Sequence, residues 1–144
     1  MSSRPTSDDQ ATADRELCGL VNALAHQIET HVRDRAGTIG LTPAQAVALR
    51  ELTGPMTMRD LAERMSCEPS NATFIIDRLE EKGLVERQTT PRDRRVKQIV
   101  LTADGVQVRE RLLALLIQGS PLQPLTQQEQ QTLHQLLARA VTGQ

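Results

Sequence analysis

Aromatic side chains are almost absent from this sequence of 144 residues, which contains one phenylalanine, Phe74, and neither tyrosine nor tryptophan. A ligand pocket in this protein must therefore be lined by leucine, valine, isoleucine, methionine and cationic side chains. Cysteine is also scarce: Cys18 and Cys67 are the two present. Two cysteines do not make a disulfide framework, so we expect a reducing, cytoplasmic location.

Long apolar runs are missing as well. The longest run, Leu112–Ile117, is far shorter than the roughly 20 residues that cross a bilayer, so we expect no contact with a membrane. The first residues are polar, so no secretory signal is expected. No serine–histidine–aspartate context, Walker loop or HExxH motif occurs, and we expect no enzyme, no catalytic residue and no cofactor. His26 and His31 lie five residues apart and do not share a helix face as metal ligands at i and i+4 do, so no metal is expected.

A pair of short helices is predicted between residues 57 and 83. Thr57 is a predicted N-cap, and the first helix has apolar residues at i, i+3, i+4 and i+7: Met58, Leu61, Ala62 and Met65. Pro69 suits the first turn of the second helix, and Gly83 suits its end. The apolar stripe of the second helix has the same spacing: Ala72, Ile75, Ile76 and Leu79. This arrangement indicates a helix-turn-helix.

The opposite face of the second helix carries small polar side chains, one aromatic ring and one cation: Ser70, Asn71, Thr73, Phe74 and Arg78. In helix-turn-helix proteins the second helix enters the major groove of DNA. Asparagine pairs with adenine, serine and threonine pair with either partner, and phenylalanine packs against the thymine methyl group. Taken alone, this face has an alternative interpretation as an ordinary solvated helix surface.

Two strands are predicted next, at residues 84–87 and 96–101, on either side of a polar segment. Residues 87–97 contain five cations and one acid, a net charge of +4, although the whole chain has a net charge of −1. Cations on a hairpin suit phosphate contact or insertion of arginine into a narrow minor groove. A solvated charged turn is the alternative, but the order helix, turn, helix, basic hairpin favours a reader of double-stranded DNA.

These segments resemble the DNA-binding domain of the MarR family of transcriptional regulators. The matching residues are Pro69–Thr73, Asp77–Glu80, Gly83–Arg87, Asp93-Arg94-Arg95 and, five residues later, Leu101-Thr102. The resemblance implies a mainly α fold with a small β-wing, in which a winged helix-turn-helix core is joined to N- and C-terminal dimerisation helices. It also implies that Asp93 orients the wing while Arg95 reaches the minor groove. We expect Arg92, Arg94 and Arg95 to contact the DNA backbone and the minor groove. Phe74 departs from the family pattern, which often has a basic or small residue there.

Amphipathic helices are predicted on both sides of this core. We expect residues 1–13 to be a disordered tail, residues 14–36 and 103–144 to form a helical dimerisation region, and residues 37–102 to form the DNA-binding domain. The aliphatic surface of the flanking helices exceeds what one chain can bury, which favours a two-fold homodimer on a pseudo-palindromic operator. A monomer whose helices simply cover the core is the alternative.

The resemblance further implies a repressor that is released by a small-molecule effector. Cys18 lies near the position of the reactive cysteine in family members that sense organic hydroperoxides, so a redox-sensing repressor is one alternative. Those sensors hold their thiol with tyrosines, which this chain lacks. The alternative for Cys18, and also for Cys67, is that the side chain packs as a small hydrophobic group. An alternative of another class is a winged-helix module that binds protein and not DNA, but such a module has no use for the wing cations.

Overall fold

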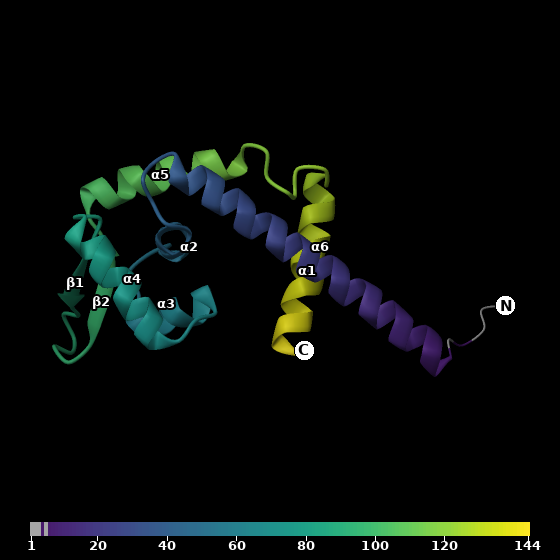
Figure 1. Ribbon diagram of the computed structural model, residues 1–144. Coiled ribbons are helices and arrows are strands. Elements are labelled where there is room, and N and C mark those ends of the chain that lie inside the picture. The colour runs from purple at the N-terminus through teal and green to yellow at the C-terminus, as the bar shows by residue number, and fades with distance from the viewer. Residues whose placement is uncertain (1–3, 5) are drawn as a thin grey trace. The chain divides into compact units, whose positions relative to one another are not determined.

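The computed structural model describes residue 4 and residues 6–144 of the chain. Two compact units are present, one formed by Glu29–Gln118 and the other by Met1–Ile28 together with Gly119–Gln144. The elements in chain order are α1 (Ser7–Gly37), α2 (Pro43–Glu51), α3 (Met58–Met65), α4 (Pro69–Glu81), β1 (Val85–Thr89), β2 (Lys97–Leu101), α5 (Ala103–Ile117) and α6 (Gln127–Thr142) (Figure 1).

Helix α1 begins at Ser7, so the prediction of a disordered tail is wrong for residues 7–13. The amide of Asp9 donates to Thr6 Oγ1 at 3.1 Å, and the amide of Thr6 donates to Asp9 Oδ2 at 3.2 Å. These reciprocal bonds satisfy two backbone donors at the helix start. They also hold the pKa of the Asp9 carboxyl below its ordinary value. Residues 1–3 and 5 of the predicted tail lie outside the described residues.

The unit formed by residues 29–118 contains a winged helix-turn-helix, which confirms the predicted fold class. Strands β1 and β2 pair antiparallel, with Val85 opposite Leu101 and Thr89 opposite Lys97. A short third segment joins them, because Met56 and Ile99 exchange two backbone bonds of 3.2 and 2.7 Å. The core is aliphatic, and its largest fully buried side chains are Leu49, Leu52, Leu61, Ile76, Leu79, Val85, Ile99 and Leu112.

Helix α2 lies in the middle of this unit and packs against α3, α4 and α5 (Figure 1). Its start has the predicted capping box, in which Thr42 and Gln45 exchange two bonds of 3.2 Å. Lys82, which follows α4, donates from Nζ to Gly40 O at 2.9 Å and to Gln45 Oε1 at 3.2 Å. The end of α4 is therefore fixed to the start of α2.

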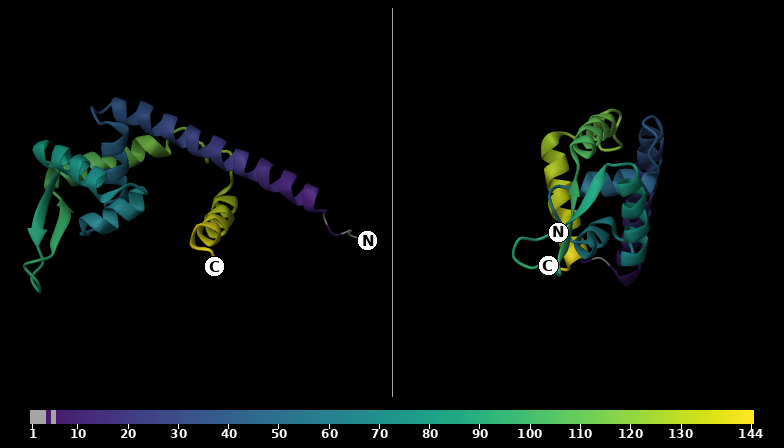
Figure 2. Two further views of the ribbon diagram at one scale, coloured as in Figure 1. Left: turned by 60° about the horizontal axis from the view of Figure 1, so that its bottom comes forward. Right: turned by 90° about the vertical axis from the view of Figure 1, so that its left-hand side faces the viewer.

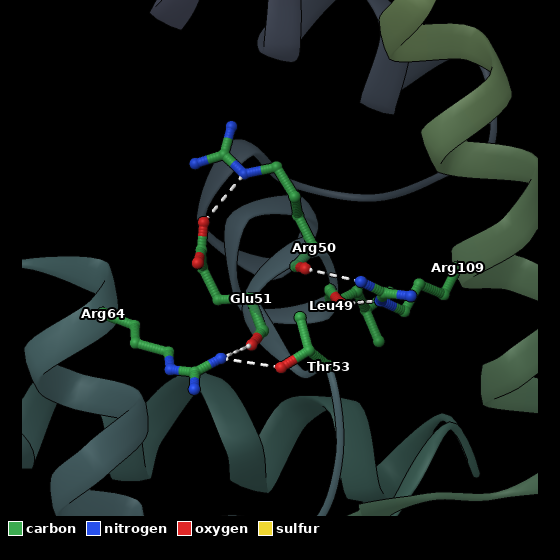
Figure 3. Close-up of polar contacts among 6 residues, drawn as sticks. All are labelled: Leu49, Arg50, Glu51, Thr53, Arg64 and Arg109. Carbon is green, nitrogen blue, oxygen red and sulfur yellow. Dashed lines mark hydrogen bonds and ion pairs between the residues drawn. The ribbon is translucent and has the colours of Figure 1, made fainter. Parts of the chain in front are cut away.

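Two arginines from neighbouring helices bind the carboxyl end of α2 (Figure 3). Arg64 of α3 donates to Glu51 O at 3.2 Å and to Thr53 Oγ1 at 2.7 Å. Arg109 of α5 donates to Leu49 O at 2.8 Å and to Arg50 O at 2.9 Å. The last carbonyls of a helix lack partners within the helix and carry partial negative charge, so cationic donors stabilise this end. Helix α2 thus connects α5 to the helix-turn-helix.

Replacing Arg109 with alanine should lower the free energy of unfolding by about 2 kcal/mol, because two charge-assisted bonds to half-buried carbonyls are lost. Arg111→Ala is the matched control, since Arg111 is an exposed arginine of the same helix. Urea denaturation of both variants measures the difference. Equal unfolding midpoints for the two variants would contradict the role of Arg109.

The second unit contains the first part of α1 and all of α6. Helix α6 begins with the predicted capping box of Thr126 and Glu129, with bonds of 2.9 and 3.1 Å. No described residue of α6 is buried, and the buried residues of α1 lie in the other unit. Large apolar side chains are exposed on both helices: Leu17, Leu20, Val21, Leu136, Leu137 and Val141.

The predicted domain boundaries differ from those of the compact units, because α5 belongs to the unit that contains the winged helix. The assignment of the flanking helices to dimerisation stays a prediction. Among the described residues, no helix combines the length and the apolar character that crossing a membrane requires.

Candidate nucleic-acid interface

Helix α4 has one buried face and one exposed face. Pro69 occupies its first turn, and Ala72, Ile76 and Leu79 have no exposed surface. The five residues that we expected on the opposite face are all exposed: Ser70, Asn71, Thr73, Phe74 and Arg78. Their contact with DNA stays a prediction, but their common outward orientation is the geometry that a major-groove helix needs.

A shallow cavity of about 400 Å³ lies beside this face. Asn71 and Phe74 line it from α4, and Cys67 lines it from the turn between α3 and α4. Cys67 is half-buried there, which agrees with the alternative that it packs as a small hydrophobic side chain. Thr73 donates from Oγ1 to Pro69 O at 2.9 Å, so its hydroxyl keeps only acceptor capacity for a base.

The wing is the β1–β2 hairpin, and it projects beyond the helices of its unit (Figure 2). Asp93 organises its tip, because its Oδ1 accepts from the Arg95 amide at 2.9 Å and its own amide donates to Thr90 Oγ1 at 3.1 Å. Arg92, Arg94 and Arg95 are exposed, and within the described residues none of their side chains makes an ion pair or hydrogen bond. The tip therefore presents free guanidinium groups.

Arg87, which counted toward the predicted wing charge, has a different role. Its Nη2 donates to Asp77 Oδ1 at 2.6 Å and its Nη1 donates to Glu80 Oε1 at 2.8 Å. The bond that Arg87 donates to Asp77 is the main reason why the pKa of Arg87 is raised. This pair of ion pairs joins β1 to α4, so Arg87 sets the position of the wing relative to the helix and is not free for phosphate. The net charge of +4 overstates the cations available to DNA.

The base of the wing is closed by Thr102. Its Oγ1 donates to Gly83 O at 2.6 Å and accepts from the Gly105 amide at 3.0 Å. Its amide donates to Leu84 O at 3.1 Å. One residue therefore caps α5 and fixes the turn that ends α4, where Gly83 has a φ of +75° that favours glycine.

The sulfur of Cys18 lies in the other unit, exposed, and 3.9 Å from Asp14 Oδ2. Its proposed role as a packed hydrophobe is therefore wrong for the single chain, and its role as a redox sensor stays a prediction. His31 Nε2 lies 2.8 Å from Leu116 O, where it ties α1 to the end of α5. Among residues 4 and 6–144, no group of three or more metal-ligating side chains is placed to hold an ion.

Comparison with known proteins agrees with this geometry. The model of the MarR family matches residues 41–97, which comprise α2, α3, α4 and most of the wing. The HTH-type transcriptional repressor MdtR of Bacillus subtilis (strain 168) is 36% identical over 110 residues, which cover 75% of this chain and 70% of that protein. The organic hydroperoxide resistance transcriptional regulator of the same organism is 26% identical over 136 residues, covering 93% of this chain and 90% of that protein.

A solved structure with the same architecture contains DNA. It is the crystal structure of a mutant MarR from E. coli complexed with operator DNA, with a TM-score of 0.70 and 26% sequence identity. The match covers 87% of this chain and 93% of that chain.

Proposed function

Because the chain belongs to the MarR family of transcriptional regulators, we propose that it is a homodimeric repressor that binds a pseudo-palindromic operator and leaves it when a small effector binds. One observation supports DNA binding most directly: Arg87 joins the wing, which has free arginines at its tip, to the helix that has the exposed polar face. Affinity for DNA comes mainly from cations on phosphates, and sequence preference comes from side chains at base edges.

The two surfaces have different tasks in this proposal. Arg92, Arg94 and Arg95 contact phosphates and the minor groove, with Asp93 holding the tip in shape. The exposed face of α4 lies in the major groove and contacts base edges through Ser70, Asn71, Thr73, Phe74 and Arg78.

The uncovered apolar faces of α1 and α6 support a homodimer. Leu20 is 69% exposed and Val141 is 85% exposed, which is costly in water but normal at an interface between copies. Two-fold symmetry gives two recognition helices, so half-sites should lie about 34 Å apart, one turn of the double helix.

A cavity of about 330 Å³ within the unit of residues 29–118 supports effector binding. It has the aliphatic and cationic lining that the lack of aromatics predicts, with Leu52, Val100, Val106 and Arg109 among its walls. Its volume is at the lower end of the range for small-molecule pockets. An effector that drew Arg109 away from α2 would loosen the link between α5 and the helix-turn-helix.

The proposal is tested by fluorescence anisotropy with duplex DNA from immediately upstream of the protein's own gene, at two salt concentrations under reducing conditions. We expect tight binding that survives competitor DNA and weakens steeply with salt. Absence of binding, together with no enrichment of any sequence from a random duplex library, would favour the protein-interaction module.

The division of tasks predicts two distinct mutant behaviours. Arg95→Ala should weaken binding to every duplex by about tenfold and lower the salt dependence by about one counterion. Asn71→Ala should instead reduce the preference for the cognate duplex over random DNA, because an amide that pairs with adenine carries sequence information. The same anisotropy titrations measure both effects, with Arg111→Ala as the charge-matched control. Equal weakening of all sequences by both substitutions would overturn this division.

A further inference from the structure

Phe74 is the single aromatic residue of the chain, and 59% of its surface is exposed. It lies on α4 directly opposite the buried residues Ala72, Ile76 and Leu79. The ring borders the shallow cavity that Val47 and Met65 also line, but most of its surface is in solvent. Its place is at the centre of the surface that the proposed function turns toward DNA.

Arg78 lies one turn further along the same face and packs on this ring. Its Cζ is 4.9 Å from the ring centroid, which is the geometry of a cation–π contact. Its Nη1 also donates to both carboxylate oxygens of Glu81, at 3.2 and 3.0 Å. Within the described residues, Nε and Nη2 of Arg78 make no hydrogen bond, so the guanidinium keeps donors for a further partner.

Glu81 is a weak partner for this guanidinium. The side chains of Arg78 and Glu81 are 50% and 65% exposed, and exposed ion pairs contribute little to stability. Arg78 can therefore exchange Glu81 for an acceptor on DNA at small cost. The ring of Phe74 remains beneath the guanidinium during this exchange and limits the positions that it can reach.

We propose that Phe74 and Arg78 read two adjacent bases as one unit, namely a thymine and the guanine next to it on the same strand. The ring packs against the thymine methyl group, and the guanidinium donates to guanine O6 and N7. Bases of one strand rise 3.4 Å per step, so a guanidinium held 4.9 Å from the ring meets the neighbouring base and not a more distant one. This inference rests on the proposed function, because it specifies what the DNA-reading helix recognises.

The thymine contact of Phe74 and the guanine contact of Arg78 predict different losses of affinity when each base is modified. Removing the thymine methyl group loses the burial of about one methyl-sized group, which corresponds to about a fourfold loss of affinity. Removing guanine N7 breaks the bidentate pair, which corresponds to about a tenfold loss.

The test begins with selection of binding sites from a random duplex library by the full-length wild-type protein. We expect the enriched sequence to contain a thymine adjacent to a guanine in each half-site. Deoxyuridine in place of that thymine should reduce wild-type affinity about fourfold, and 7-deazaguanine in place of that guanine should reduce it about tenfold. Phe74→Ala should bind the thymine and deoxyuridine duplexes equally, and Arg78→Ala should bind the guanine and 7-deazaguanine duplexes equally.

Thermal unfolding by circular dichroism serves as the folding control, and both variants should melt as the wild type does because Phe74 and Arg78 are exposed. Arg111→Ala, at an exposed position of α5 outside this face, should keep both base sensitivities. An enriched site without the thymine–guanine step would overturn the proposed role of Phe74 and Arg78 while leaving the proposed function intact. Equal wild-type affinity for the thymine and deoxyuridine duplexes would have the same consequence. Failure to enrich any sequence would overturn both.

Discussion

Alanine at position 105 should destabilise the winged-helix unit by about 3 kcal/mol, at the upper end of the usual cost of overpacking. A Cβ atom added to Gly105 would lie 1.9 Å from the carbonyl oxygen of Leu84 and 2.9 Å from its carbonyl carbon. That oxygen accepts the Thr102 amide at the base of the wing, so neither group can move without opening the junction between β2 and α5. A loss of this size is a large part of the roughly 5–15 kcal/mol that stabilises a domain.

Chemical denaturation of the Gly105→Ala variant, followed by circular dichroism, measures this cost. Gly54→Ala is the matched control in the same unit, because a Cβ at Gly54 meets no atom within 4 Å and should change stability by less than about 0.5 kcal/mol. If both variants unfold at the wild-type midpoint, the close approach of α5 to Leu84 is not a fixed feature of the protein.

Helix boundaries were predictable from the sequence where their signals are local. Thr42, Thr57, Thr102 and Thr126 each accept a backbone bond from the residue three positions later, so the cap and its partner stand side by side in the sequence. Thr6 and Asp9 have the same relationship, but they lie in a polar segment without an apolar stripe. The start of α1 was therefore predicted too late, at Asp14, because the apolar stripe begins only after that residue.

The contacts that position the candidate site were not predictable in this way. Arg109 binds carbonyls about 60 positions earlier in the chain, and Arg87 binds acids on the preceding helix. Apolar periodicity records which face of a helix is buried, but it does not record which distant backbone a long cation reaches. For this reason Arg87 was counted with the free cations of the wing, although it is paired with Asp77 and Glu80.

The sequence predicted which residues lie on the exposed face of α4, but it did not predict the contacts between their side chains. Exposure of the five residues follows from the stripe of Ala72, Ile76 and Leu79 on the other side. The stacking of Arg78 on Phe74 depends on side-chain rotamers, which a spacing of i and i+4 permits but does not require. That contact changes the interpretation of the face from separate readers to a coupled pair.

The amphipathic character predicted for residues 14–36 is present as an apolar stripe on α1, but within the described chain the first half of this stripe covers nothing. Leu17 is 63% exposed and Leu20 is 69% exposed, whereas Val32, on the same stripe, is buried in the winged-helix unit. An apolar stripe that is buried at one end and exposed at the other is the pattern expected of a helix that continues into an interface. The sequence indicated that the stripe needs a second apolar surface to cover it, but not whether that surface belongs to the same chain.

Aspartate at both positions 17 and 20 should convert the proposed dimer to a monomer and reduce operator affinity by about 100-fold or more. Burial of one leucine contributes about 2 kcal/mol, and two-fold symmetry places four of these leucines in the interface. Four buried carboxylates in their place are far costlier still. A monomer carries one recognition helix, so it loses the effective concentration that tethers the second half-site.

Sedimentation velocity measures the oligomeric state, and anisotropy with a full operator and a single half-site measures the binding. The control is Gly19→Asp with Asn22→Asp, which adds the same charge at the same spacing on the opposite, exposed face of α1. We expect the control to remain a dimer with wild-type affinity. The Leu17→Asp, Leu20→Asp protein should keep wild-type affinity for the half-site, because Leu17 and Leu20 lie outside the unit that contains α4 and the wing. If it instead sediments as a dimer, the copies associate through a surface other than the stripe of α1, and the apolar exposure of that helix requires a different partner.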